Sequence, residues 1–351
     1  MSEQTSIHNS PDSEEVSVLD SPDSEESSVL DLQIQDLEGV GPTTEKKLKD
    51  AGVSSVLDLS VSLPAELSDK IGGTKENASA MIFAAQRLLM DSGLIEKEFV
   101  PAIETLEKRK TMMKCTTGST NLDDLFKGGI ETQAITEFYG DFGSGKSQIC
   151  HTLSITSQLA HEEGGLNGSV IYIDTEGTFR PERIEQISEA KGLDPLEILK
   201  NILVCKAYNS SHLELIIRSL GKYIEQHKTK LIVIDSIISL HRAEFMGRGT
   251  LADRQQKLNA IIHRLLRVSE IYNVAVIVTN QVQSTPDVFF GDPTKPAGGN
   301  VIAHACTYRI YLRKSGQDRT AIMMDSPYHP YSDTRFRIFD GGVENAEPKK
   351  K

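Results

Sequence analysis

The amino-acid sequence predicts an α/β protein in which a large, mainly parallel sheet is preceded by a small all-α domain and a disordered acidic tail. Apolar, β-branched runs alternate with amphipathic helical stretches from residue 111 to 345. Near-continuous apolar strands of this kind belong to parallel sheets that are covered on both faces. Residues 34–92 instead combine glycine turns with helical periodicity. A linker (93–110) separates the two predicted domains, and residues 346–351 form a short basic tail.

Residues 1–33 are repetitive, rich in Ser, Asp and Glu, and almost free of aromatic residues. The run SPDSEEVSVLD (10–20) recurs as SPDSEESSVLD (21–31), and the hexapeptide SSVLDL (27–32) recurs at 54–59. A segment with so little apolar surface to bury is predicted to be disordered. A tandem duplication in a tolerant tail is one explanation of the repeat. The alternative is a functional acidic tail.

Charge and cysteine content narrow the class of protein. The net charge is −12, but residues 1–38 contain eleven acidic residues and no Lys or Arg, so the remaining chain is nearly neutral and a nucleic-acid partner is not excluded. No apolar run reaches the roughly 18–20 residues that span a bilayer, and no signal pattern opens the chain. Four widely spaced cysteines predict reduced thiols in a cytoplasmic protein: Cys115, Cys150, Cys205 and Cys306.

The predicted core strands are short, apolar and rich in β-branched residues, and they span residues 133–139, 169–174, 201–205, 230–235 and 273–279. Helical stretches separate them near residues 146–163, 181–191, 211–227 and 250–271. Residues 305–339 hold further apolar runs with short connections. Short connections predict antiparallel strands, here added at one edge of the sheet.

The segment GDFGSGKS (140–147) follows a predicted strand, opens a predicted helix and fits the pattern G-x-x-x-x-G-K-[ST]. Its glycines let backbone N–H groups face phosphate oxygens, and the start of the helix adds a positive dipole end. Lys146 is expected to reach the β- and γ-phosphates, and Ser147 to offer a hydroxyl to Mg²⁺. The alternative is a glycine-rich turn without a ligand. The predicted nucleotide-binding residues here are Gly140, Asp141, Phe142, Gly143, Ser144, Gly145, Lys146, Ser147 and Gln148.

Polar side chains at the ends of other predicted strands complete a candidate catalytic set with Lys146. Asp235 ends the run LIVID, where a carboxylate can hold Mg²⁺ through water. Glu176 is the candidate general base that orients a water for in-line attack on a γ-phosphate, although a helix N-cap is an alternative for this region. Gln281 is either a sensor of the γ-phosphate or a simple polar strand end.

Two further segments have compositions that favour contacts with nucleic acid. Residues 241–267 hold six basic side chains against two acidic ones, and glycines flank Arg248 so that its guanidinium can reach a phosphate. Arg264 and Arg267, near the end of this segment, are expected on a solvated helix face. Residues 281–300 form a long stretch rich in Pro and Gly, and such a stretch in a compact domain is functional or disordered.

In this order, the segments resemble the RecA-type homologous recombinases, most closely the archaeal recombinases and their eukaryotic counterparts. The resemblance covers residues 34–345 and is carried by GGIETQAITEFYGDFGSGKSQ, YIDTEGTFRPERI, LIVIDS, GRGTLADRQ, VTNQVQ, GDPTKPAGGNVIAHA and DSPYHP. Ser147 stands where archaeal relatives commonly carry Thr, and the hydroxyl is kept.

The resemblance implies a RecA-like P-loop ATPase core and assigns roles to further residues. Arg183 is implied to stack on the adenine of ATP, while His304, Asp325 and Pro327 are implied to approach ATP across a subunit interface. Asp325 is also a candidate ligand for a monovalent cation such as K⁺. The implied DNA-binding residues of two loops are Arg242, Arg248, Gly249 and Arg254, then Phe289, Phe290, Gly298, Gly299 and Asn300.

Two motifs outside the core also match the family. LEGVGPTTEKKL and KIGGTKENA resemble helix-hairpin-helix elements, which implies that Gly39, Gly41, Lys46 and Lys47 contact duplex phosphates; a simple packing turn is the alternative. FVPA (99–102) matches a polymerisation motif in which an extended linker places Phe99 and Ala102 in pockets of a neighbouring core. The alternative is that Phe99 folds onto its own chain.

The function implied is that of a DNA-dependent ATPase, using ATP and Mg²⁺, that forms helical filaments on single-stranded DNA and promotes homologous pairing and strand exchange in recombination and repair. The further expected partners are double-stranded DNA, other copies of the chain (in filaments or rings), and recombination mediators or paralogues. The expected location is the nucleoid in the cytoplasm, not a membrane. A ring-forming motor and a paralogue without strand exchange are the rival functions. The FVPA motif, the N-terminal domain and the two loops favour the recombinase.

Overall fold

The computed structural model describes residues 32–97, 99–245, 251–284, 294–298 and 300–347. Several sequence predictions lie outside these residues: the repeated tail up to residue 31, Arg248 and Gly249 of the first predicted DNA loop, and Phe289, Phe290 and Gly299 of the second. None of the described helices is both long and apolar enough to cross a membrane.

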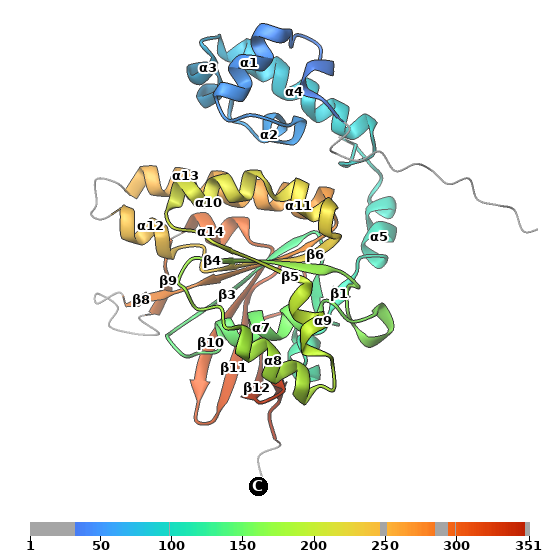
Figure 1. Cartoon of the computed structure of the whole chain (residues 1–351), viewed down its shortest axis with the longest axis vertical. Helices are drawn as coiled ribbons and strands as arrows, with labels where there is room; N and C mark the ends of the chain where they lie inside the picture. The colour runs from blue at the N-terminus through green and yellow to red at the C-terminus, as the bar shows by residue number, and fades with distance from the viewer. Residues whose placement is uncertain (1–31, 98, 246–250, 285–293, 299, 348–351) are drawn as a thin grey trace, which may run out of the picture.

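Within the described residues, nine strands form one sheet in the order β13-β12-β11-β10-β3-β7-β6-β4-β5 (Figure 1). The six strands from β10 to β5 are parallel, and β11, β12 and β13 continue the sheet in antiparallel pairs. The strands are β3 (Ala134–Gly140), β4 (Ser169–Asp174), β5 (Ile202–Lys206), β6 (Thr229–Asp235), β7 (Ala275–Asn280), β10 (Tyr308–Ser315), β11 (Asp318–Asp325), β12 (Ser332–Phe339) and β13 (Gly342–Asn345). Two short pairs stand apart, β1 (Lys114–Cys115) with β2 (Ile130–Glu131) and β8 (Val282–Ser284) with β9 (Thr294–Pro296).

The predicted mainly parallel sheet is therefore confirmed, and each of the five predicted core strands matches an observed strand within two residues at either end. β3, β4, β6 and β7 are buried along almost their entire length, as expected for strands packed on both faces. One detail differs from the prediction for residues 305–339. β10 is parallel to β3 on one side and antiparallel to β11 on the other, so it joins the two parts of the sheet.

Helices cover both faces of the sheet (Figure 1). One hydrophobic cluster packs α6 (Thr120–Leu125), α7 (Lys146–Thr156), α8 (Pro181–Ala190) and α9 (Pro195–Lys200) against one face. The other packs α10 (Ser210–Arg218), α11 (Leu220–His227), α13 (Leu251–Ile271) and α14 (Asn300–Ala305) against the opposite face, with α12 (Ser239–Glu244) beside α10. The single helix expected over 211–227 is divided at Ser219, whose hydroxyl bonds back to the carbonyl of Ile216.

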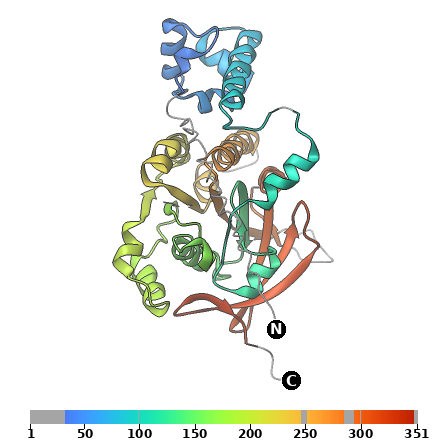
Figure 2. The ribbon, with the colours of Figure 1, turned by 90° about the vertical axis from the view of Figure 1, so that its right-hand side faces the viewer.

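Residues 32–91 form a small helical domain with its own hydrophobic core. It contains a 3₁₀ turn (Ile34–Asp36), α1 (Pro42–Asp50), α2 (Val56–Ser60), α3 (Pro64–Ile71) and α4 (Lys75–Asp91). Figures 1 and 2 both place this domain over the face of the sheet that carries α10 and α13.

The linker departs from the sequence prediction. Residues 93–110 were predicted to be a linker, but residues 102–110 of it form the helix α5, and Ala102 of the FVPA motif is its first residue. Pro101 precedes it and Glu104 lies in its first turn, and both residues favour the start of a helix. Among the described residues before Pro101, 92–97, Phe99 and Val100 lie outside helices and strands.

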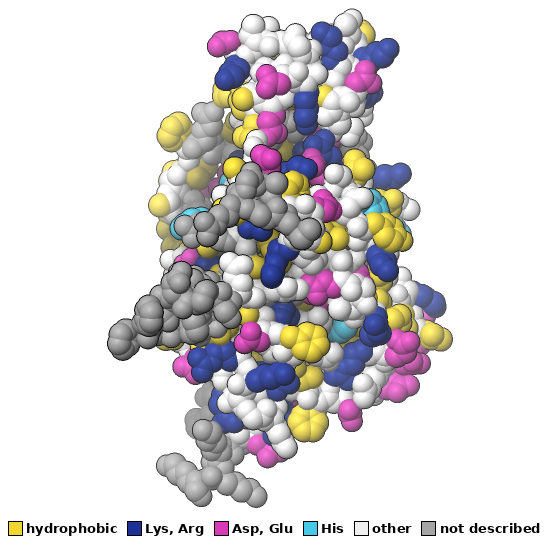
Figure 3. Space-filling view, turned by 90° about the vertical axis from the view of Figure 1, so that its left-hand side faces the viewer, with side chains coloured by type: hydrophobic (Ala, Val, Ile, Leu, Met, Phe, Trp, Pro, Cys, Tyr) yellow, Lys and Arg dark blue, Asp and Glu magenta, His cyan; other side chains and the backbone are white. Residues whose placement is uncertain are grey.

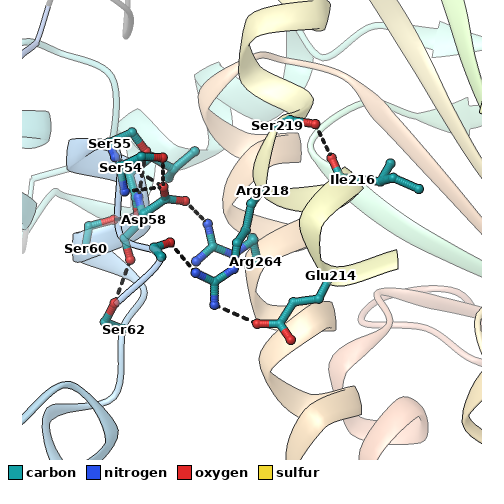
Figure 4. Close-up of polar contacts among 12 residues, drawn as sticks. Ser54, Ser55, Asp58, Ser60, Ser62, Glu214, Ile216, Arg218, Ser219 and Arg264 are labelled. Carbon is teal, nitrogen blue, oxygen red and sulfur yellow. Dashed lines mark hydrogen bonds and ion pairs between the residues drawn. The ribbon is translucent and has the colours of Figure 1, made fainter. Parts of the chain in front are cut away.

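The small domain contacts the core through a buried ion pair between Asp58 of α2 and Arg264 of α13 (Figure 4). Asp58 also accepts backbone hydrogen bonds from Ser54 and Ser55, at 3.0 and 3.2 Å, so its carboxylate caps α2 while it holds Arg264. Beside it, Leu57 is buried in the core cluster that includes α10 and α13. The second copy of SSVLDL, residues 54–59, therefore forms the docking element of the small domain.

Arg264 was predicted to lie on a solvated helix face, and that prediction is wrong, because the small domain covers this part of α13 and leaves Arg264 only 8% exposed. The prediction holds for Arg267, which is exposed and pairs with Glu270 on its own helix. Arg218 of α10 strengthens the contact by donating to the carbonyl of Gly52 and to Glu214 (Figure 4).

Replacing Arg264 by Ala is expected to loosen the small domain from the core. Removing one partner of a buried ion pair costs about 3–5 kcal/mol, because the other charge stays buried without compensation. The expected result is faster proteolysis in the linker at residues 92–97 and two thermal transitions in place of one. Arg267→Ala, one turn along the same helix, is the matched control. Identical proteolysis rates for the two variants would contradict a docking role for Arg264.

Candidate functional site

The segment from Gly140 to Ser147 connects the end of β3 to the start of α7, as the motif predicts. Gly143 and Gly145 have φ values of 72° and 110°, which L side chains rarely adopt. A Cβ on Gly145 would also lie 2.8 Å from Cδ1 of Ile338. Glycine is thus required for the tight curve that directs backbone N–H groups toward the cavity in front of α7.

Lys146 lies at the centre of this loop. Its Nζ donates to the carbonyl oxygens of Gly140 and Asp141, at 2.8 and 3.0 Å. Burial lowers the pKa of Lys146, and the nearby carboxylates of Asp235 and Glu176 act against that shift. The ammonium group is therefore partly desolvated, and a partly desolvated cation attracts an anion such as phosphate more strongly than a fully hydrated one.

Asp235 ends β6, is 3% exposed and is oriented by hydroxyl groups from neighbouring strands. Tyr172 of β4 donates to Oδ2 at 3.0 Å, Thr178 donates to the same oxygen at 3.4 Å, and Thr279 of β7 donates to Oδ1. These three residues were not singled out from the sequence, because tyrosine and threonine are ordinary residues there. The register of β4, β6 and β7 brings Tyr172 and Thr279 to Asp235, and the turn after β4 brings Thr178.

Asp174 has a structural role that prepares the position of Glu176. Its carboxylate accepts hydrogen bonds from four successive backbone N–H groups, those of residues 176–179. This is a capping arrangement, and it fixes the turn that follows β4. Asp174 thus caps a turn and not a helix, because α8 begins at Pro181 and its N-cap, Arg180, makes no side-chain capping bond. The helix N-cap alternative is therefore not observed in this region.

Glu176 and Gln281, predicted from separate segments, lie in contact. Gln281 Nε2 donates to Glu176 Oε1 at 2.8 Å, and Ser236 Oγ donates to the same oxygen at 2.6 Å. Arg242, at the end of α12, donates to Gln281 Oε1 at 3.2 Å. A single amide group therefore bridges the candidate base and a residue that was predicted to contact DNA.

These residues surround one cavity of about 650 Å³. Predicted residues in its wall are Gly140, Phe142, Gly143, Gly145, Lys146, Ser147, Gln148, Glu176, Asp235 and Gln281. The wall also includes Thr178, Val282, Arg319 and Ile338, which were not predicted. Arg319 and Ile338 come from the antiparallel strands at the sheet edge, where no local motif marks them. Phe142 is 96% exposed, so the tip of the loop projects from the molecule.

The donor set of this cavity fits a nucleoside triphosphate with Mg²⁺. Backbone N–H groups, the N-terminus of α7 and Lys146 are suited to phosphates. Ser147 and Asp235 offer the oxygen ligands that Mg²⁺ prefers. Within the described residues, no group of three His, Cys, Asp or Glu side chains could hold a metal alone. Phosphate oxygens and water would therefore have to complete the coordination.

Arg183, predicted to stack on adenine, lies on α8 and contacts α7. Its Nε donates to Gln148 at 2.8 Å, and its other nitrogens bond to the carbonyls of Phe339 and Asp340. Burial lowers the pKa of Arg183, and nearby acidic residues oppose that shift. The guanidinium group is held in place between α8 and the turn that joins β12 to β13.

His304, Asp325 and Pro327 do not line the phosphate cavity. They surround a separate hollow of about 350 Å³ between the end of α14 and the end of β11, together with Ser326 and Thr307. The three predicted residues are thus brought together with one another but not with Lys146. This arrangement requires a second chain if His304 and Asp325 are to reach a nucleotide.

The described DNA-binding candidates are spread over several elements. Gly39 and Gly41 are exposed just before α1, and Lys46 and Lys47 are exposed within it. Arg254 is half-buried in α13, and Gly298 is buried with its φ at 90°. Asn300 begins α14. Figure 3 shows basic and acidic side chains interspersed along one face from the small domain to the core.

The doubly covered sheet and the phosphate loop define a P-loop protein of the α/β class. A family model described as Rad51 matches residues 108–346. The chain is 51% identical over 315 residues to the DNA repair and recombination protein RadA of Cenarchaeum symbiosum (strain A), and the alignment covers 90% of this chain and 79% of that protein. The chain therefore belongs to the Rad51 family of RecA-type recombinases.

Proposed function

We propose that this protein is a DNA-dependent ATPase that forms helical filaments on single-stranded DNA and promotes homologous pairing and strand exchange in recombination and repair. The observation that carries the proposal is the contact of Gln281 with both Glu176 and Arg242. It connects the phosphate cavity to the two segments that match the DNA-binding loops of the family. The state of the γ-phosphate and the binding of DNA are thereby coupled through one side chain.

ATP and Mg²⁺ are the proposed ligands of the cavity, and their chemistry is phosphoryl transfer to water with charge neutralised by the metal. Lys146 and the N–H groups of residues 143–147 bind the phosphates. Ser147 would hold Mg²⁺ directly and Asp235 through water, with Tyr172 and Thr279 keeping that carboxylate in place. Glu176 orients a water and accepts its proton at Oε1 or Oε2.

DNA is proposed to contact Arg242, Arg254 and the residues of the two loops, while the start of α1 binds duplex phosphates as a helix-hairpin-helix element. Gly39 and Gly41 keep this turn free of side chains, and Lys46 and Lys47 add positive charge beside it. The acidic tail, which precedes this domain, would compete with phosphates and lower duplex affinity at low salt. Asp325, with the adjacent His304, is a proposed site for K⁺ at a subunit interface.

Self-assembly is proposed to use Phe99 and Ala102 of the linker. Phe99 is 92% exposed on its own chain, so it does not fold back onto the described residues. β5 lies at the edge of the sheet, and the surface beside it is an apolar groove of about 490 Å³ lined by Leu203, Val204, Leu215 and Tyr223 among others. An extended segment that pairs with β5 of a neighbour would place Phe99 in this groove.

A strand-exchange assay on the purified protein tests this function, with Lys146→Ala as the variant. The wild type is expected to exchange strands only with ATP. The variant is expected to lose ATP binding, turnover and exchange, because the positive charge that binds the phosphates is removed. Electron microscopy of the ATP–DNA complex separates the rivals. Rings without exchange would support a motor, and DNA binding without exchange would support a paralogue.

A further inference from the structure

Glu137 is a fully buried carboxylate to which the proposed function assigns no role. It lies on β3, three residues before Gly140, with 0% exposure. Arg309 of β10 donates from Nε to Oε2 at 2.7 Å, and Asn280 of β7 donates from Nδ2 to Oε1 at 2.7 Å. Both carboxylate oxygens are thus engaged by side chains from the two strands that flank β3.

Asn280 is the last residue of β7 and directly precedes Gln281. Its Nδ2 donates a second hydrogen bond, to the carbonyl of Ala297 at 2.7 Å. The N–H of Ala297 in turn donates to the carbonyl of Gln281 at 2.8 Å. Ala297 is therefore held from both of its backbone polar groups, once by the side chain of Asn280 and once by the backbone of Gln281.

These two hydrogen bonds join the two ends of the segment 281–297. β8 and β9 pair above it, with Val282 opposite Pro296. Val282 packs in turn against Tyr139 and Tyr311 of the sheet. The two ends of the segment that matches the second DNA loop thus cannot move independently while Asn280 and Ala297 remain in contact.

We infer that Glu137, Asn280 and Ala297 form a positioning clamp, which sets the backbone of Gln281 so that its amide meets Glu176. The backbone carbonyl of Gln281 accepts one hydrogen bond from Ala297 of the clamp, and the side chain of Gln281 donates one to Glu176. A shift of Ala297 therefore moves the backbone that carries the amide. Arg309 completes the clamp by neutralising Glu137, whose carboxylate would otherwise be buried without a counter-charge.

The inference rests on the proposed DNA-dependent ATPase, and it names residues that act through Gln281 and do not touch the nucleotide. Asn280 is absent from the lining of the phosphate cavity, so its loss leaves the groups that bind phosphate in place. The clamp therefore predicts a loss of coupling between DNA and turnover with ATP affinity retained. A misplacement of about 1 Å costs up to about 100-fold in turnover.

The test compares the full-length wild type with Asn280→Ala and with Asn280→Asp, which keeps the shape of the side chain but has at most one O–H donor, so it cannot donate to both Glu137 and Ala297. For both variants we expect the KM for ATP to stay within about twofold, and DNA-stimulated kcat to fall by about 10-fold or more, toward the DNA-free rate. We also expect faster amide hydrogen exchange at Ala297, a readout that needs no catalysis.

Tyr308→Phe is the matched control. It removes one buried hydrogen bond to a carboxylate, from Tyr308 at the start of β10 to Glu131 of β2, and touches none of the hydrogen bonds among Glu137, Asn280 and Ala297. This variant should lose stability but keep its DNA stimulation. If the wild type itself shows no DNA stimulation, the proposed function fails. If the wild type is stimulated and both Asn280 variants match it in kcat and in exchange at Ala297, the clamp is refuted.

Discussion

Replacing Glu176 by Gln is expected to lower ATP turnover by about 10²–10⁴-fold while ATP still binds. Glutamine keeps the length of the side chain and an oxygen that can accept from Gln281 and Ser236, so the contacts at 2.8 and 2.6 Å can persist. What the change removes is the carboxylate that accepts a proton from water. Phosphate binding depends on Lys146 and the loop, which the change does not touch.

A variant that binds ATP but does not hydrolyse it should stay in the ATP-bound state. We therefore expect Glu176→Gln to assemble on single-stranded DNA with ATP and to dissociate more slowly than the wild type. Single-turnover hydrolysis, a fluorescent nucleotide titration and a DNA-release assay together measure this. Glu185→Gln, on the exposed side of the nearby α8, is the matched control.

Two outcomes would contradict the assignment of Glu176. Near-normal turnover would show that another group accepts the proton. Loss of ATP binding would show that Glu176 is needed for the shape of the site, since its contacts with Gln281 and Ser236 join the turn after β4 to the ends of β6 and β7.

The strands and the phosphate loop could be predicted because their signals are local. A buried parallel strand needs a short run of apolar, β-branched residues, and the loop needs glycines at fixed spacing. Asp235, Glu176 and Gln281 could be predicted to converge because the carboxyl ends of parallel strands meet at one edge of a sheet. This convergence does not depend on the order in which the strands occur in the sequence.

Other features depend on contacts between distant segments. Arg264 was misassigned because a charged residue on a helix is expected to face solvent. Only the docking of Asp58, from about two hundred residues earlier in the chain, buries it. Arg319 and Ile338 reach the cavity because β11 and β12 extend the sheet beyond β10, which no motif indicates. Glu137 resembles any strand residue until Asn280 and Arg309 are placed on the flanking strands.

Replacing Phe99 by Glu is expected to prevent assembly of long filaments without unfolding the chain. The side chain is 92% exposed in the single chain, so the change costs little there, whereas a carboxylate in an apolar groove of a neighbour is buried without a partner. That cost is on the order of 3 kcal/mol or more per interface, which weakens each contact by at least about 100-fold. Light scattering and electron microscopy measure the length of the assemblies.

A complementary variant on the other side of the interface makes the test specific. Leu215, 63% exposed on α10, lies in the groove beside β5, and Leu215→Glu should block assembly from that side. Each variant then keeps one intact surface, so mixing the two should give heterodimers in which Phe99 of one chain meets the groove of the other, and nothing longer. Phe83→Glu, at an exposed phenylalanine of the small domain, is the control that should still form filaments. Normal filaments from Phe99→Glu, or no heterodimers in the mixture, would rule out this pairing of linker and groove.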